Sequence, residues 1–205
     1  MRPAARVAAA IDLLGLIEVL DRPADRVVER WFKDHRFAGS KDRAAINEIV
    51  YGVVRNRAML AWDVGRLTHE HMVGPRSLAL AELVRSRNLD RTSIEDLFDS
   101  SQYGPPALSE EESSLLKKLL SKSSADPNPP DSVRVNCPDW LFGVIRDSLG
   151  ESTVAELRAM QQRPMLGLRT NTINATPEEA MCALGEEGVT AERCPHARTA
   201  LGIHG

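Results

Sequence analysis

Residues 40–57 read Ser-Lys-Asp-Arg-Ala-Ala-Ile-Asn-Glu-Ile-Val-Tyr-Gly-Val-Val-Arg-Asn-Arg. The apolar residues Ile46, Ile49, Val50 and Val53 recur at spacings of three and four, which places them on one side of an α-helix. This spacing predicts a helix over residues 41–62, with Ser40 as its N-cap and its apolar side turned toward a core.

The same periodicity predicts further helices on both sides of this segment. They cover about residues 3–20, 23–35, 75–88 and 109–122, with Gly39 ending the second of them. No part of residues 1–122 alternates with a period of two for long enough to predict a strand. We therefore expect residues 1–122 to form an all-helical bundle with an aliphatic core.

The pattern changes after residue 122. Residues 123–136 are rich in Pro and Ser and indicate a linker. Residues 137–205 then mix helical periodicity with strand-like segments near 165–173, 189–193 and 200–203. They predict a small α/β domain that we expect to be truncated, because three short strands are few for a sheet. The predicted fold class is mainly α, a helical bundle followed by this module.

Composition narrows the possible functions. The 205 residues are 42% hydrophobic and 27% charged, with a net charge of −3, which excludes a chain that binds nucleic acid through uniform positive charge. Residues 1–91 nevertheless carry a net charge of +4, so any such site is a local patch there. No apolar run approaches the roughly 20 residues that cross a bilayer, so we expect no membrane association and a cytoplasmic protein. The three cysteines lack disulfide or zinc spacing and are expected to be reduced.

Cationic and aromatic residues share one row of the predicted helix over 41–62. Arg43, Asn47, Tyr51 and Arg55 follow one another at steps of four, beside the apolar side. Guanidinium groups bind phosphate oxygens in pairs, and an aromatic ring stacks on an unpaired base, so this row is a candidate RNA surface. The alternative is an ordinary solvated face on which Asp42, Glu48 and the arginines pair while Tyr51 is partly buried. Arg2 and Arg6 can extend the RNA surface if the first helix ends nearby.

A second candidate lies in the strand-like segment 165–173. Arg169 and Asn171 alternate with apolar neighbours and share one face, from which they can contact an RNA backbone or base. The alternative is an exposed sheet face without a ligand. With nine aromatic residues in the chain and no aromatic RNA-recognition strand, phosphate and shape contacts would dominate any binding.

Signals of catalysis are absent from the sequence itself. It has no Gly-x-Gly-x-x-Gly segment, Walker loop, His-Glu-x-x-His or Gly-x-Ser-x-Gly motif. His69 and His71 lack further ligands at metal-binding spacing, and none of Cys137, Cys182 and Cys194 has an activating neighbour. We therefore predict no catalytic, cofactor-binding or metal-binding residue in this chain.

Two segments together resemble a known family. Lys41 to Arg55, followed by Phe98-Asp-Ser-Ser-Gln-Tyr-Gly104, is similar to the NusB-like N-terminal domain of the RsmB/Sun family of 16S ribosomal RNA cytosine-C5 methyltransferases. Cys137-Pro-Asp-Trp-Leu141 and the stretch from Gln162 to Thr172 resemble the small domain that precedes the catalytic domain in that family.

The resemblance implies a division of labour within a longer protein. In the family, a further domain binds S-adenosylmethionine and uses cysteines in Thr-Cys and Pro-Cys contexts, whereas this sequence has Cys137-Pro138 and Cys194-Pro195. No catalytic residue is carried over. The resemblance predicts an RNA-binding and substrate-positioning part whose partners are ribosomal RNA and its own missing C-terminal methyltransferase domain. The proposed RNA contacts are Arg2, Arg6, Arg43, Tyr51, Arg55, Arg169 and Asn171.

Two other hypotheses remain open from the sequence. The chain can be a standalone NusB-like factor in transcription antitermination, although such a factor would not need residues 138–205. It can also be a helical scaffold whose arginines serve only solubility.

Overall fold

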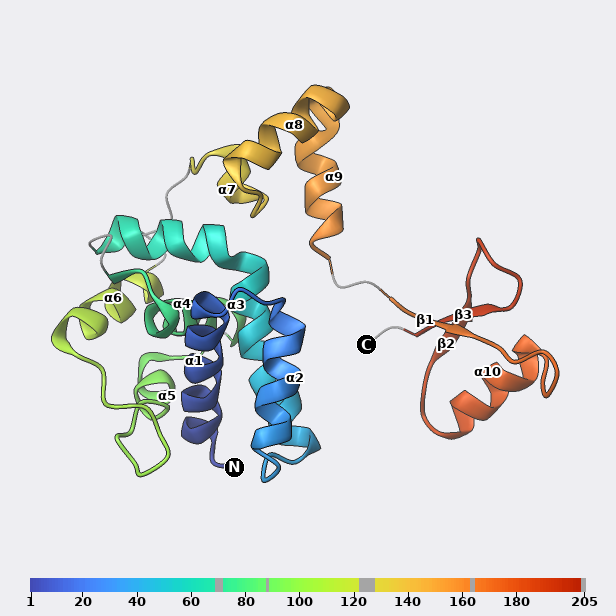
Figure 1. The fold of residues 1–205 in the computed structure, drawn as a ribbon, viewed down its shortest axis with the longest axis horizontal. Helices are drawn as coiled ribbons and strands as arrows, with labels where there is room; N and C mark the ends of the chain where they lie inside the picture. The colour runs from blue at the N-terminus through green and yellow to red at the C-terminus, as the bar shows by residue number, and fades with distance from the viewer. Residues whose placement is uncertain (69–71, 88, 122–127, 163–164, 204–205) are drawn as a thin grey trace. The chain divides into compact units, whose positions relative to one another are not determined.

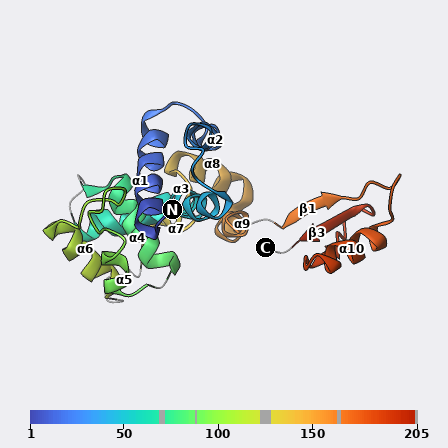
Figure 2. The ribbon, with the colours of Figure 1, turned by 90° about the horizontal axis from the view of Figure 1, so that it is seen from below.

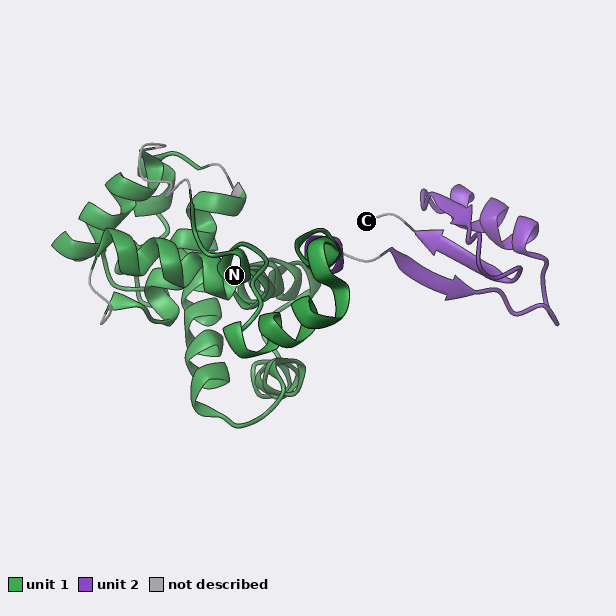
Figure 3. Cartoon of the chain, turned by 90° about the horizontal axis from the view of Figure 1, so that it is seen from above, with its two compact units in different colours: residues 1–157 green, residues 158–205 purple. Residues whose placement is uncertain are grey.

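The computed structural model describes residues 1–68, 72–87, 89–121, 128–162 and 165–203. They form two compact units, residues 1–157 and residues 158–205, which Figure 3 shows in different colours. Each unit is described by itself.

Helix α3 (Ser40–Leu67) is the centre of the first unit, where it packs against α1 (Pro3–Val19) and α4 (Pro75–Arg87). Its predicted apolar side is buried, since Ile46 and Val50 are fully enclosed and Ile49 and Val53 nearly so. Leu60 and Val64 continue that side beyond residue 57. The facing residues are also aliphatic, and burial of so much apolar surface is the main force that holds the three helices together.

Three further helices surround this centre (Figure 1). Helix α2 (Ala24–Asp34) lies against α1 and adds Val27, Val28, Trp31 and Phe32 to the core. On the other side, α6 (Glu110–Leu120) packs on α4 and α3, and the short α5 (Arg91–Glu95) packs on α6. Ser109 caps α6, because its side chain accepts a hydrogen bond from the Glu112 amide while Glu112 accepts one from the Ser109 amide.

The α3–α4 contact is close enough to require a glycine. A Cβ atom on Gly52 would lie 2.3 Å from Glu82 Oε1 of α4, so only glycine fits there without a shift of the facing side chain. Glu82 itself is only 4% exposed, and its Oε2 has no hydrogen-bond partner among the described residues. Burial raises the pKa of Glu82, and the nearby Arg85 and Arg55 offset this only in part.

A second, smaller core lies at the end of the first unit. Helices α7 (Asp131–Arg134), α8 (Asp139–Leu149) and α9 (Thr153–Met160), with a short 3-10 helix at Gly150–Ser152, enclose Val135, Cys137 and Leu157. Helix α7 contacts α3, where the Met59 amide donates to Asn136 Oδ1 at 3.1 Å.

The second unit is a three-stranded antiparallel sheet with one helix against it (Figure 2). The strands are β1 (Leu166–Arg169), β2 (Ala191–Arg193) and β3 (Ala200–Ile203), and β3 is the central strand. Leu168 pairs with Leu201 in β1–β3, and Arg193 pairs with Leu201 in β2–β3. Helix α10 (Pro177–Glu186) contacts β2 and β3, and Thr176 caps it in a capping box with Glu179.

The predicted fold class is confirmed: the chain is mainly α, with a small α/β module at its end. Some details differ from the sequence predictions. Gly39, rather than Ser40, is the N-cap of α3, and the helix continues to Leu67 because Leu60 and Val64 extend its buried side. Periodicity missed α5 and α7, since five and four residues are too few to show a repeat.

Within the described ranges, no helix combines the length and the hydropathy needed to cross a membrane. His69, His71, Asn88, Lys122, Arg163 and Pro164, which entered the sequence predictions, lie outside the residues described. The predicted domain limits at 122 and 137 stay predictions.

Arg76 links α4 to α6 and to the segment that precedes α6. Its guanidinium donates to Glu112 Oε1 at 2.6 Å and Oε2 at 3.1 Å and to the Pro106 carbonyl at 2.8 Å, and it lies 4.9 Å from the centre of the Phe98 ring. We predict that Arg76→Ala lowers the free energy of unfolding by about 2–3 kcal/mol, because it leaves the buried Glu112 carboxylate without its cationic partner. Urea denaturation measures this. Arg91→Ala, which breaks the exposed pair with Glu95, is the control and should cost at most about 0.5 kcal/mol.

Glu82 makes stability depend on pH in a defined direction. Because burial raises the pKa of Glu82 in the folded protein, its favourable contribution is present at low pH and is lost as the pH rises through that raised value. We predict that Glu82→Gln raises the free energy of unfolding by about 1 kcal/mol at pH 7, since it removes a buried, partly unpaired charge. This gain in the free energy of unfolding should vanish at pH values below the ordinary pKa of glutamate. A loss of stability at pH 7 would show instead that the carboxylate is fully paired.

Candidate nucleic-acid interface

The N-terminal ends of α1 and α3 meet at Asp42. Arg6 Nε donates to Asp42 Oδ1 at 2.8 Å, and the Met1 ammonium group lies 3.1 Å from both carboxylate oxygens. The hydrogen bond from this ammonium group, followed by that from Arg6, lowers the pKa of Asp42 despite its burial. Arg6 thus lies beside the first turn of α3, as predicted, but its charge is largely balanced by Asp42.

Arg43 is held in a fixed place at the same end of α3. Its Nε donates to the Ala38 carbonyl at 2.8 Å, and its guanidinium lies 5.3 Å from the centre of the Phe32 ring of α2. The side chain is still exposed, and no described contact uses its two Nη groups. Those groups can bind two oxygens of one phosphate at little entropic cost, because the guanidinium is already oriented.

The middle of the predicted row is partly covered. Tyr51 is half-buried and packs against the core, and burial, with a smaller effect of the Asp25 charge, raises the pKa of Tyr51. Asn47 is also half-buried, and its Oδ1 has no partner among the described residues. The Phe32 ring of α2 lies beside Arg43, and the Asp25 charge of α2 acts on Tyr51, so side chains of α2 influence this row of α3. Spacing alone could not show this, because it does not say where the next helix packs.

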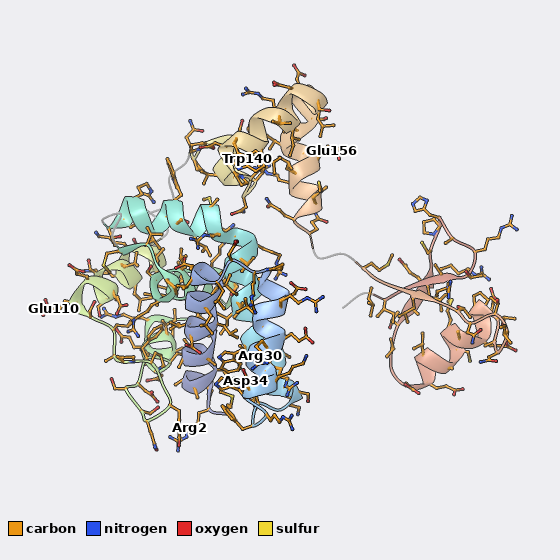
Figure 4. The ribbon with its side chains drawn as sticks, viewed as in Figure 1. Arg2, Arg30, Asp34, Glu110, Trp140 and Glu156 are labelled. Carbon is orange, nitrogen blue, oxygen red and sulfur yellow. The ribbon has the colours of Figure 1, made fainter. Side chains whose placement is uncertain are left out.

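Arg55 and Arg2 are both exposed. Arg55 follows Arg43 by 12 positions, or about 18 Å along the helix, and forms none of the ion pairs found in the described part of the chain. Arg2 is the N-cap of α1 and points away from the helix end in Figure 4. By contrast, Arg30 and Asp34 on α2 neutralise one another at 2.9 Å, and Figure 4 shows them close together.

Arg169 and Asn171 line one polar hollow of about 530 Å³ in the second unit, together with Thr170, Thr172, Ile173 and Thr199. Two hydrogen bonds order the lining: the Thr170 amide donates to the Thr199 carbonyl at 2.8 Å, and the Asn171 side-chain Oδ1 accepts from the Ile173 amide at 3.3 Å. The hydroxyl of Thr170 is buried and has no partner among the described residues. The arrangement offers one cation and several hydroxyl and amide groups to a polar ligand.

Sequence reasoning missed two exposed aromatic residues of the first unit. Phe37, between α2 and α3, is 68% exposed, and Tyr103, in the loop after Phe98, is 72% exposed. Both residues stand next to glycine and polar residues, which indicate loops. An aromatic residue within a predicted loop was therefore the sequence feature that could have identified them.

The described groups fit binding better than covalent chemistry. Cys137 is buried, and burial, followed by the Asp139 charge, raises the pKa of its thiol, which disfavours the thiolate nucleophile. In the part of the chain that the structure describes, no three His, Cys, Asp or Glu residues gather as metal ligands. The exposed guanidinium groups, in contrast, suit phosphate oxygens.

Comparison with known proteins agrees with the resemblance seen in the sequence. Residues 137–205 match the family described as Methyltr_RsmF/B-like, ferredoxin-like domain. Ribosomal RNA small subunit methyltransferase B of Escherichia fergusonii is 23% identical to this chain, over 77% of the chain and 38% of the relative, and the Escherichia coli protein matches to the same extent. The chain thus spans about two fifths of the length of these curated relatives.

A solved structure has the same fold over the whole chain. The crystal structure of PH0851 aligns with 100% of this chain and 49% of its own, with a TM-score of 0.57 and 20% sequence identity. This likeness concerns the fold. At the level of sequence, residues 137–205 resemble the RsmF/B-like ferredoxin-like domain, and the chain as a whole is similar to part of ribosomal RNA small subunit methyltransferase B.

Proposed function

We propose that this chain is the RNA-binding and substrate-positioning part of an S-adenosylmethionine-dependent ribosomal RNA cytosine-C5 methyltransferase. The observation that carries the proposal is the order of its parts: a helical bundle precedes a domain of the RsmF/B-like methyltransferase kind. The same order disfavours a standalone antitermination factor, which would not need the second domain.

The bundle contributes a set of outward-facing cations. Arg43, Arg55 and Arg2 are the exposed members of the proposed phosphate contacts, and Arg6 supports them by fixing α1 to the first turn of α3. Tyr51, which is half-buried, would touch RNA only with its exposed edge. Since these groups belong to a NusB-like bundle with a rigid core, they meet the RNA already oriented.

The second unit contributes the Arg169–Asn171 hollow. One guanidinium group and the neighbouring amide and hydroxyl groups suit a phosphate or ribose. Two weak sites on connected units raise the effective concentration of RNA at each other, so modest separate affinities give firm binding together.

The covalent step belongs to another domain in this proposal. S-adenosylmethionine would be held by the methyltransferase domain of the full-length enzyme, and no residue of this chain is assigned to it. The partners are then ribosomal RNA and that domain, and the place of action is the cytoplasm.

Salt dependence tests the proposed phosphate contacts. Arg55→Ala should reduce the slope of log K against log salt for RNA binding by about 0.7–0.9, the value of one lost phosphate contact. Fluorescence anisotropy with a small-subunit ribosomal RNA fragment measures the slope. Arg55→Lys keeps the charge and should keep the slope.

Arg91→Ala is the matched control for net charge. Arg91 is exposed like Arg55 but pairs with Glu95 at 2.7 Å, so its removal changes the charge of the chain equally without removing a proposed contact. Equal slopes for Arg55→Ala and the unaltered chain would contradict the assignment of Arg55. Absence of RNA binding by the unaltered chain would contradict the proposed function.

A further inference from the structure

A largely apolar hollow opens at the N-terminal end of α1. Its volume is about 800 Å³, within the range of about 300–1,000 Å³ that holds small ligands. Alanine side chains of α1 form one wall and leave room, while Trp31, Phe37 and Tyr103 supply rings and Arg2 and Gln102 supply polar groups.

The rings stand on segments that are fixed rather than free. Trp31 is 6% exposed, its Nε1 donates to Asp12 Oδ2 at 2.8 Å, and the His35 ring stacks on it at 3.9 Å between centroids. His35 also contacts the Phe37 ring edge to face at 5.6 Å. The buried Trp31 therefore anchors the segment that presents Phe37.

The loop that carries Tyr103 is equally well tied. The Ser101 amide donates to Asp99 Oδ1 at 2.9 Å, the Gly104 amide to the Ser101 carbonyl at 3.0 Å, and the Ala107 amide to Ser100 Oγ at 2.7 Å. A Cβ atom on Gly104 would lie 2.1 Å from Asp99 Oδ1, so glycine allows this tight turn. Two large rings held at the surface on ordered loops keep apolar area in water, which is unfavourable unless a ligand covers it.

The charges around the hollow favour an anionic ligand. Arg2 lines it, and Arg36, Lys41 and Arg43 lie in the adjoining α2–α3 turn and the first turn of α3. Of the carboxylates at this end, Asp42 is already paired with Arg6 and the Met1 ammonium group. Asp12, which lines the hollow, accepts a hydrogen bond from the neutral Trp31 indole and has no cationic partner there. Hydrogen bonds from Ser101, with a smaller effect of Arg2, lower the pKa of Asp99, which keeps that carboxylate ionised. Cationic side chains therefore outnumber the carboxylates that lack an ion-pair partner at this end of the bundle.

We infer that this hollow takes an unpaired RNA base, stacked on Phe37 and Tyr103, with Arg2 on the adjoining phosphate. Exposed aromatic rings stack on any base, and the Gln102 amide can form a hydrogen bond with the edge of a base. Bases that are paired within a double helix are not accessible to the rings or to the amide. The inference rests on the proposed function and adds to it a preference for single-stranded segments.

The test compares a single-stranded RNA decamer with a blunt-ended RNA duplex of ten base pairs on the 205-residue chain, by fluorescence anisotropy at fixed salt. Phe37→Ala or Tyr103→Ala should weaken binding of the decamer about 10-fold and leave duplex binding unchanged. Phe37→Leu and Tyr103→Leu keep an apolar side chain but remove the aromatic ring, so they should weaken decamer binding to a similar extent. None of these substitutions of Phe37 or Tyr103 should alter the slope of log K against log salt, whereas Arg2→Ala should reduce that slope by about 0.7.

Trp140→Ala is the matched control, because Trp140 is 73% exposed on α8 and does not line the hollow. It should leave decamer affinity unchanged, and unfolding midpoints should agree for all variants of these exposed rings. Unchanged decamer binding by the Phe37 and Tyr103 variants, alongside the expected Arg55 salt effect, would overturn the inference and leave the proposed function standing. Self-association or capture of an apolar peptide that Phe37→Ala abolishes, without an effect on RNA, would assign the hollow to a protein partner and overturn it as well.

Discussion

Burial of one side of α3 is the constraint on which the first unit depends. Ile46, Val50 and Val64 are fully enclosed, and the same helix contacts α1, α4, α6 and α7. The fit is close enough that Gly52 cannot carry a side chain against Glu82 without a shift. Since the rotation of α3 is fixed by this packing, the side of the helix that carries Arg43 and Arg55 is fixed too, and the proposed RNA binding would need no ordering of that helix.

Electrostatic pairing then decides which cations remain for a ligand. Arg6 is engaged by Asp42, Arg76 by Glu112 and Arg57 by Glu18, so these arginines stabilise the bundle. Arg2, Arg43 and Arg55 form no such hydrogen-bonded ion pair among the described contacts, although the charge of Arg55 acts on Glu82 and that of Arg2 on Asp99. A chain with net charge −3 can thus still offer a local cationic surface. The aromatic hollow at the end of α1 adjoins that surface through Arg2.

The fold was largely predictable from sequence because amphipathic periodicity survives packing, as the buried side of α3 shows.

The site was only partly predictable. Spacing put Arg43, Tyr51 and Arg55 in one row, but Tyr51 packs partly against the core and the Phe32 ring of α2 lies beside Arg43, and only tertiary structure shows that. Phe37 and Tyr103 are 66 residues apart in sequence and line one hollow through tertiary packing, which no local pattern encodes. The predicted strand over 165–173 is shorter in the structure, since β1 ends at Arg169 and Asn171 follows it, although both residues line one hollow.

Photo-crosslinking of a 4-thiouridine-labelled small-subunit ribosomal RNA fragment to the chain tests the central claim most directly, because it reports where RNA lies rather than how tightly it binds. The account predicts cross-linked peptides from the start of α1, from residues 36–57 and from the loop around Tyr103, with a further set near Arg169. Cross-links confined to the acidic start of α6 or to the exposed side of α8 would contradict it.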